Sequence, residues 1–162
     1  MGVNIFLPRA KSITRIAAGK RAQAGGERWQ TLFHNCAIRQ GFHCIRIPDG
    51  CKQAGKKLLR VQTPFDFVLS GKGARMAFID TKSCKTKRFA ASGKVAHQIR
   101  DLLALENHSH IAGYLVLFST SGEVVFFSAY QLHAMIERSS LGPEDGKIIG
   151  LATGFDINKV FA

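Results

Sequence analysis

The chain has 162 residues and a formal net charge of +12 at pH 7, with 46% hydrophobic and 21% charged residues. This length and composition predict one globular domain with a buried core and exclude a disordered or fibrous protein. The longest apolar run, "IAGYLVLF", is too short to cross a bilayer, so we expect no membrane partner.

The first 24 residues predict a basic N-terminal arm, because they contain five Lys or Arg residues and no acid. The arm has no uninterrupted apolar stretch, so a secretory signal is not expected. A mitochondrial presequence has a similar composition and is kept as a minor alternative.

A helix is predicted to begin at Gly25-Gly26, in "ERWQTLFHNCAIRQ", and to end at Gly41. Its apolar residues recur at helical spacing and form one face, which places Trp29 in the core rather than on a base-stacking surface. The residues of this face are Trp29, Leu32, Phe33, Cys36 and Ala37.

Strands and one connection follow this helix. "FHCIRI" alternates as a strand does, and the Gly- and Lys-rich "PDGCKQAGKKLLRVQT" predicts an exposed loop or a short projecting hairpin. "PFDFVL" and "ARMAFIDTK" predict two strands around the turn residues "SGKG".

The second half of the chain alternates between helices and strands. "KTKRFAASG" is a basic loop, "KVAHQIRDLLALEN" a helix, "IAGYLVLFST" and "EVVFFSAY" two strands joined by a turn, and "QLHAMIER" a short helix. The order predicts an α/β fold, more closely an α+β mixed sheet flanked by helices, in a single domain over residues 25–162.

The four cysteines form no Cys-x-x-Cys pair, so we expect no disulfide framework. A zinc site is a possible alternative, but the spacing fits no common pattern and favours buried thiols beside incidental histidines. The residues considered for it are His34, Cys36, His43, Cys44 and Cys51.

The charge is unevenly distributed along the chain. Residues 1–100 hold 20 of the 23 Lys and Arg residues and only four of the 11 acids, a formal charge of +16, whereas residues 101–162 carry −4. This asymmetry indicates a polyanionic partner, and nucleic acid is favoured over a merely basic surface.

The acids that remain in the basic half call for a specific explanation. Asp80 and Lys82 share one strand face because alternate side chains point the same way, and a hairpin would bring Asp66 close to Asp80. Glu27 lies where the first helix is predicted to start. Converging carboxylates suit a hard cation such as Mg²⁺ or Mn²⁺, which would assist attack on a phosphodiester, whereas an isolated Asp-x-Lys is more often an ion pair.

The step from "PFD" to "DTK" resembles the PD-(D/E)xK nuclease superfamily, whose restriction-endonuclease-like core is a mixed sheet with flanking helices. The stretch "FIDTKSCKTKRFAASGKVAHQIRDLLAL" and the hydrophobic hairpin after it resemble the RecU-type Holliday-junction resolvases over roughly residues 63–133. Asp80 stands where those proteins usually have Glu. The segment before Asp66 is shorter than the one that builds their junction-probing stalk.

The resemblance implies a role for each matching residue. Asp66 and Asp80 would be metal ligands, with the Thr81 carbonyl as a further ligand, and Lys82 would be the catalytic lysine. Gln98 would face the site from the following helix, and Glu27 would be the acid of the first helix.

Contacts with DNA are expected from three places. Lys85, Lys87 and Arg88 follow the site directly and would bind phosphates, although a solvated charge run is the alternative. The basic connection with Lys56, Lys57 and Arg60 would enter the branch of a junction. His97 is either a DNA contact or a histidine of the helix surface or core.

These features predict a Mg²⁺- or Mn²⁺-dependent endonuclease that acts as a homodimer on branched DNA, with a four-way junction as the favoured substrate. A phage or mobile-element nuclease on other branched or duplex DNA is one alternative, and a non-catalytic DNA-binding protein of the same fold is another. A bacterial or phage-encoded cytoplasmic protein is expected.

Overall fold

The computed structural model of the chain describes residues 13–54, 57–61, 63–71, 75–90, 95–137 and 140–162, and at residues 13–22, 51–54, 57–61 and 137 it describes the backbone alone. The first half contains α1 (Ile13–Arg39), β1 (His43–Arg46), β2 (Gly50–Ala54), β3 (Lys57–Val61), β4 (Phe67–Ser70) and β5 (Met76–Cys84). The second half contains α2 (Ala96–Asn107), β6 (Ile111–Phe118), β7 (Glu123–Ser128), α3 (Ala129–Glu137), the 3-10 helix η2 (Pro143–Asp145), β8 (Lys147–Leu151), β9 (Gly154–Phe155) and α4 (Asn158–Phe161).

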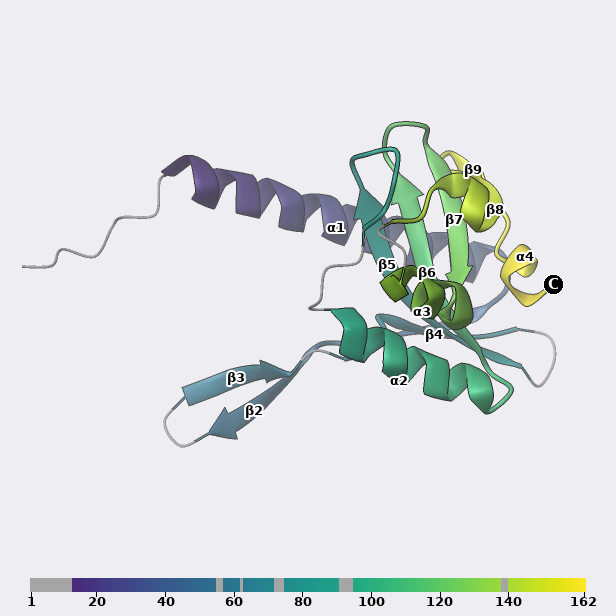
Figure 1. Ribbon diagram of the computed structural model, residues 1–162, viewed down its shortest axis with the longest axis horizontal. Helices are drawn as coiled ribbons and strands as arrows, with labels where there is room; N and C mark the ends of the chain where they lie inside the picture. The colour runs from purple at the N-terminus through teal and green to yellow at the C-terminus, as the bar shows by residue number, and fades with distance from the viewer. Residues whose placement is uncertain (1–12, 55–56, 62, 72–74, 91–94, 138–139) are drawn as a thin grey trace, which may run out of the picture.

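A seven-stranded sheet in the order β1-β4-β5-β6-β7-β8-β9 forms the centre of the molecule. β5 and β6 run parallel, joined by α2, and the other neighbouring strands are antiparallel. Helices cover both faces of this sheet (Figure 1). The predicted fold class, a mixed sheet flanked by helices, is confirmed.

Two hydrophobic cores lie on opposite faces of the sheet. Trp29 and Phe33 of α1 pack on the face that holds Ile79, together with α4. Ile99 and Leu102 of α2 pack on the other face, together with α3. The prediction that Trp29 is a core residue is confirmed, since its side chain is buried against Phe33 and other rings of that core.

The strand β5 contributes to both cores because its side chains alternate. Ala77 and Ile79 lie in the core with α1, whereas Phe78 packs with the core of α2 and α3. Asp80 and Lys82 follow Phe78 at two-residue steps and share its face. The buried acid Asp80 therefore lies on the face of the sheet that α2 covers.

The first helix begins earlier than the sequence pattern indicated. It starts at Ile13 and continues through Gly25-Gly26, so the predicted start at those glycines is wrong. The preceding "ITRIAAGKRAQA" is rich in Ala, Arg, Lys and Gln, which are strong helix formers and outweigh the helix penalty of about 1 kcal/mol for each Gly. The predicted end is confirmed, since Gly41 has φ +84° and its N–H bonds to the Ile38 carbonyl.

The Gly- and Lys-rich connection forms a projecting hairpin, the second of the two alternatives. β2 and β3 pair antiparallel as a separate two-stranded sheet, with Gly50 opposite Val61 and Ala54 opposite Lys57. Figure 1 shows this hairpin standing away from the seven-stranded sheet, on the same side as the N-terminal half of α1.

Two boundaries near the sheet edges differ from the sequence pattern. β4 begins at Phe67, so Asp66 precedes the strand, although its N–H still bonds to the Ile79 carbonyl and its carbonyl accepts from the Ile47 N–H. β8, β9 and α4 were not predicted, because Gly150 and Gly154 interrupt any alternation in "KIIGLATGF". No helix within the described ranges is long and apolar enough to cross a membrane.

Candidate active site

Asp80 is a buried carboxylate on β5, with 2% of its surface exposed. Gln98 of α2 donates from Nε2 to Asp80 Oδ1 at 3.0 Å. Lys82 Nζ lies 2.5 Å from Asp80 Oδ2, and this oxygen has no further hydrogen bond within the described residues. Asp80 and Lys82 lie side by side as predicted, and they form the ion pair that was considered as the alternative to a metal site. Gln98 faces the same carboxylate.

Burial raises the pKa of Asp80 from its ordinary value of 3.8 to about 7. The Lys82 ammonium lowers this pKa and offsets part of the burial effect, whereas the charge of Asp66 raises it further. Asp80 therefore changes protonation near neutral pH, and a cation bound at Oδ2 would favour the ionised form.

Asp66 is a half-buried carboxylate ahead of β4 and is held by Thr81. The Thr81 N–H donates to Asp66 Oδ2 at 2.9 Å and the Thr81 hydroxyl donates to the same oxygen at 2.6 Å. Both acids are thus fixed beside the middle of β5, Asp66 by Thr81 and Asp80 by Gln98. The predicted convergence of Asp66 and Asp80 is consistent with the influence of the Asp66 charge on the pKa of Asp80.

Tyr114 was not expected at the site. It lies on β6, directly beside Asp80 in the parallel register, and is fully buried. Its hydroxyl donates to Gln98 Oε1 at 2.7 Å, and Lys82 Nζ lies 5.1 Å from the centre of its ring. One feature of the sequence could have indicated Tyr114: it is a tyrosine within an otherwise apolar strand. A buried tyrosine hydroxyl usually needs a hydrogen-bond partner, so a polar residue was to be expected next to it.

In the described part of the chain, Glu27 does not form a three-acid cluster with the two aspartates. It is exposed in the middle of α1, where Gln23 donates to its Oε1 at 3.4 Å. Across the part of the chain that the structure describes, no three His, Cys, Asp or Glu side chains form a cluster that could hold a metal ion. The structure therefore brings together two carboxylates, from Asp66 and Asp80, and does not add Glu27 to them.

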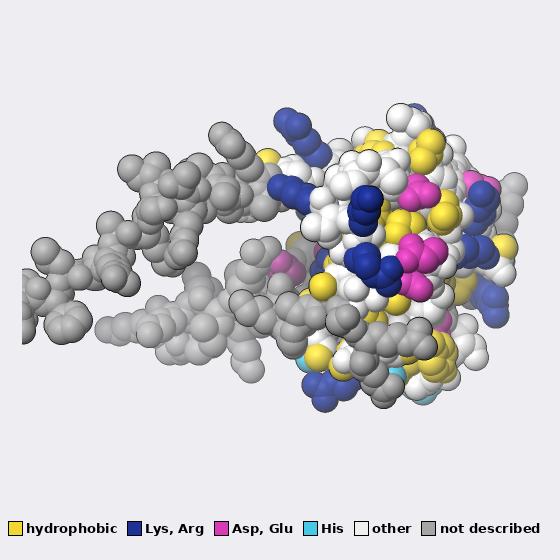
Figure 2. Space-filling view, turned by 45° about the horizontal axis from the view of Figure 1, so that its top comes forward, with side chains coloured by type: hydrophobic (Ala, Val, Ile, Leu, Met, Phe, Trp, Pro, Cys, Tyr) yellow, Lys and Arg dark blue, Asp and Glu magenta, His cyan; other side chains and the backbone are white. Residues whose placement is uncertain are grey.

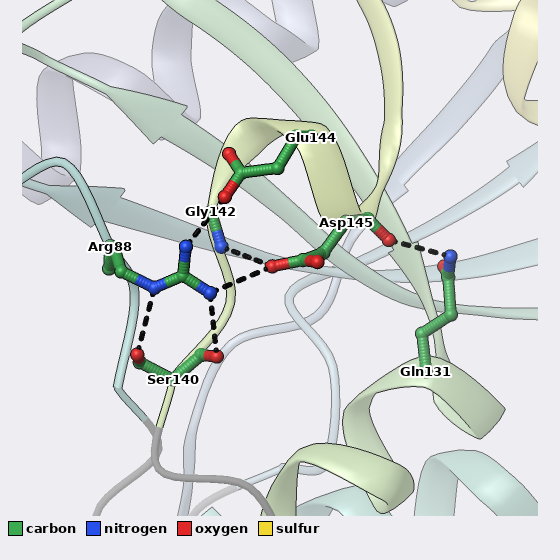
Figure 3. Close-up of polar contacts among 6 residues, drawn as sticks. All are labelled: Arg88, Gln131, Ser140, Gly142, Glu144 and Asp145. Atoms are coloured by element: carbon green, nitrogen blue, oxygen red, sulfur yellow. Dashed lines mark hydrogen bonds and ion pairs between the residues drawn. The ribbon is translucent and has the colours of Figure 1, made fainter.

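Arg88 binds other residues of the chain, as Figure 3 shows. Its guanidinium pairs with Glu144 at 2.5 Å and Asp145 at 3.0 Å, and it donates twice to Ser140. Leu141 and Phe89 exchange backbone hydrogen bonds at the same place. Arg88 thus ties the loop after β5 to the segment around η2, which leaves its donors largely engaged.

The other predicted DNA contacts occupy different surroundings. Lys85, Lys87 and His97 are exposed, so the alternative of a core histidine at position 97 is wrong, and a DNA contact or a helix-surface residue is left. On the face drawn in Figure 2, basic and acidic side chains lie next to one another. Lys57 and Arg60 lie on β3, where the structure describes the backbone, and Lys56 lies outside the described residues.

The oxygen donors lie at the middle of β5 rather than at the strand end that the sequence indicated, because β5 continues to Cys84, and they fit a small hard cation. Mg²⁺ is usually held by one or two carboxylates and completes its shell with water and substrate phosphate oxygens. Asp66 and Asp80 supply two carboxylates, and in the described residues Asp80 Oδ2 is approached by Lys82 Nζ at 2.5 Å and has no further partner. A carboxylate oxygen accepts more than one partner, so Oδ2 can bind a cation beside the lysine.

Comparison with known proteins identifies the fold. No family model matches the sequence, and no curated protein is significantly similar to it. The structure is similar to that of Hjc from Archaeoglobus fulgidus, a Holliday junction resolvase from an archaeal hyperthermophile, with a TM-score of 0.51 and 19% sequence identity. The match covers 76% of this chain and 96% of that chain. The two chains share a mixed sheet with flanking helices, whereas the closer resemblance to RecU-type resolvases stays a prediction.

Proposed function

We propose that this chain is a Mg²⁺- or Mn²⁺-dependent endonuclease that hydrolyses DNA phosphodiester bonds, with four-way junctions as its substrate. The observation that carries the proposal is the buried Asp80 carboxylate, held by Lys82 and Gln98 within the fold of a Holliday junction resolvase. The basic first hundred residues support a polyanionic substrate.

Asp66 and Asp80 would hold the cation, with the Thr81 carbonyl as a further oxygen ligand. When bound, a divalent cation of this kind polarises a phosphoryl oxygen and lowers the pKa of a bound water. Gln98 donates to Asp80 Oδ1, so the cation would bind at the other carboxylate oxygen, Oδ2.

Lys82 would act on the water that attacks phosphorus. The Lys82 side chain is 29% exposed and its Nζ lies beside Asp80 Oδ2, so the lysine stands at the edge of the buried site. From this position the ammonium can orient the water and stabilise the negative charge that develops on the phosphoryl oxygens. The phosphorus–oxygen bond to the leaving nucleotide then breaks as the new bond to the water oxygen forms.

A homodimer is part of the proposal. Resolution of a junction requires cuts in two opposed strands, and a two-fold dimer would present one site to each. A second candidate, a nuclease of other branched or duplex DNA, is favoured by the shortness of the β2–β3 hairpin, whose strands have five residues each. A hairpin of this size reaches only a short way into a branch.

The test is cleavage of a labelled four-way junction and of a duplex with the same sequence, with Mg²⁺ and with a chelator. We expect Mg²⁺-dependent cuts in the junction and far slower cleavage of the duplex. Equal cleavage of both would favour the second candidate. Tight binding without cleavage in Mg²⁺ or Mn²⁺ would identify a non-catalytic DNA-binding protein.

A further inference from the structure

Tyr114, Gln98 and Asp80 form a continuous chain of buried hydrogen bonds. The Tyr114 hydroxyl donates to Gln98 Oε1 at 2.7 Å, and Gln98 Nε2 donates to Asp80 Oδ1 at 3.0 Å. All three residues are buried, with exposures of 0%, 9% and 2% in that order. The cleavage chemistry proposed above uses Asp80 and Gln98 and leaves Tyr114 unused.

The chain has a direction that follows from its ends. An ionised Asp80 only accepts hydrogen bonds, so it requires the N–H end of the Gln98 amide. The amide oxygen then faces Tyr114, whose hydroxyl must donate. Without that donor, Gln98 Oε1 would be a buried oxygen with no hydrogen-bond partner, which costs free energy. Rotation of the amide away from Asp80 would avoid this cost.

The ring of Tyr114 has a separate contact with the site. Lys82 Nζ lies 5.1 Å from the ring centre, within the range of an attraction between an ammonium and an aromatic face. The hydroxyl and the ring can therefore be tested apart, because Tyr114→Phe removes the first and keeps the second.

We propose that Tyr114 is a positioning residue: its hydroxyl fixes the Gln98 amide, which holds Asp80 Oδ1 and so turns Oδ2, the oxygen beside Lys82, toward the place where a divalent cation would bind. This inference rests on the proposed nuclease function of the same site. Tyr114 acts through Gln98 and touches neither DNA nor cation.

Tyr114→Phe tests the hydroxyl, and Tyr130→Phe is its matched control. Tyr130 is exposed, and its hydroxyl donates to Asn107 Oδ1 at the other end of α2. We expect Tyr114→Phe to lower kcat for DNA cleavage by about tenfold to a hundredfold, the usual effect of removing a residue that supports a metal ligand, and to leave KM for DNA unchanged. Tyr130→Phe should change neither quantity. Unchanged kcat in Tyr114→Phe would overturn the proposal.

Mn²⁺ affinity, measured by calorimetry without DNA, provides a second readout that does not depend on cleavage. Tyr114→Phe should weaken it several-fold or more, while Tyr130→Phe retains it. If the wild-type chain binds Mn²⁺ but cuts no DNA, the proposed function fails, and the two affinities still decide the role of Tyr114. Equal Mn²⁺ affinity in wild type and Tyr114→Phe would overturn that role.

A double-mutant cycle with Gln98→Met separates positioning from a general loss of packing. Methionine retains the length of the Gln98 side chain and removes its amide. If Tyr114 acts through Gln98, adding Tyr114→Phe to Gln98→Met should cause no further loss of Mn²⁺ affinity. A further loss equal to that of Tyr114→Phe alone would show that Tyr114 acts independently and would overturn the proposal. Gln98→Met alone should reproduce the loss in Tyr114→Phe, which keeps the test available if that variant fails to fold.

Discussion

Lys82 Nζ approaches Asp80 Oδ2 to 2.5 Å, yet the pKa of Asp80 still rises to about 7. The lysine therefore compensates only part of the cost of burying the carboxylate. A structural ion pair would be more stable at the surface, where both charges are hydrated. A carboxylate whose pKa is raised by burial beside a specific charge partner, here in the middle of a core strand, is a candidate for a functional site.

The raised pKa of Asp80 predicts that the metal-free protein loses stability as pH rises. Folding raises this pKa from 3.8 to about 7, so the folded chain binds the proton more tightly than the unfolded chain does. The resulting stabilisation is complete below about pH 4 and is lost as pH rises through about 7. At about 1.4 kcal/mol per pKa unit, the loss is of the order of 4 kcal/mol. Thermal unfolding at pH 5 and pH 8 in a chelator measures the part of this loss that occurs above pH 5, about 3 kcal/mol.

Asp80→Asn should remove this pH dependence and raise Tm at pH 8, because the buried side chain at position 80 can no longer ionise. Asp101→Asn changes an exposed acid of α2 and is the matched control, so it should retain the wild-type decline. An unchanged decline in Asp80→Asn would show that other groups cause it.

Divalent cations should oppose the loss of stability that we expect as pH rises. The carboxylates must be deprotonated to bind a metal ion, so affinity should rise with pH through the pKa of Asp80. We expect Mg²⁺ or Mn²⁺ to raise Tm more at pH 8 than at pH 6. The increase should be absent in Asp80→Asn and present in Asp101→Asn. A full Tm increase in Asp80→Asn would exclude Asp80 as a ligand.

Asp66→Asn, Asp80→Asn and Lys82→Ala should each lower cleavage by about a hundredfold or more, with DNA binding largely retained. Each change removes a group that the proposed mechanism uses at the scissile bond and leaves the apolar core intact. Loss of an acid can even tighten DNA binding, since a negative charge near phosphate is removed. Cleavage in Mg²⁺ and affinity in a chelator are measured on the same junction.

Asp101→Asn and Lys159→Ala serve as controls for these variants, because both residues are exposed and lie on α2 and α4. Both should cleave at the wild-type rate. Near-normal cleavage in one of the three site variants would remove that residue from the mechanism.

Alternation along one strand was sufficient to predict the centre of the site. Asp80 and Lys82 lie two residues apart, so alternation placed them on one face, whereas Gln98 was placed near them only by the resemblance to the RecU-type resolvases. Asp66 was reached through the predicted hairpin of β4 and β5, although the strand begins one residue later.

The remaining features depend on contacts between segments that are distant in sequence. Tyr114 reaches Gln98 because β6 lies parallel to β5 with Tyr114 beside Asp80, a register that no local pattern encodes. Arg88 was predicted to contact DNA because it lies in a basic loop. Its partners in the structure, Glu144 and Asp145, lie more than 50 residues away in sequence, so no local pattern indicated them. Glu27 was assigned to a helix start, and the helix begins 14 residues earlier because its favourable composition outweighs two glycines.

Arg88 should therefore contribute to stability rather than to DNA affinity. Arg88→Ala removes contacts with Ser140, Glu144 and Asp145, and we expect it to lower the free energy of unfolding by about 1–2 kcal/mol. Arg88→Lys should recover only part of this, because an ammonium cannot make the same forked contacts. Denaturant unfolding measures both variants.

Lys85→Ala and Lys87→Ala provide the comparison, since both lysines are exposed on the same loop. These two variants should weaken DNA binding with little change in stability. If Arg88→Ala weakens DNA binding more than the two lysine variants do and leaves stability unchanged, Arg88 is a DNA contact and not a structural residue.

The hairpin of β2 and β3 should determine substrate choice. Its lysines suit the phosphate-dense crossover of a junction, and the hairpin projects from the sheet on the side of the N-terminal half of α1 (Figure 1). Lys56→Ala with Lys57→Ala should therefore weaken junction binding more than duplex binding at one fixed salt concentration. Binding to both DNAs should depend strongly on salt, with about −0.9 in the slope of log K against log salt for each phosphate neutralised on duplex.

The double variant should make the junction slope shallower by about 1.8, if each lysine neutralises one phosphate. Lys147→Ala with Lys159→Ala removes the same charge from the last 62 residues, so it should leave both the slope and the preference unchanged. Equal weakening on junction and duplex would make the hairpin lysines ordinary phosphate contacts, and the nuclease of other DNA substrates would then be favoured. A wild-type slope near zero would remove the argument from charge altogether, because a polyanion held by basic side chains must release counterions when it binds.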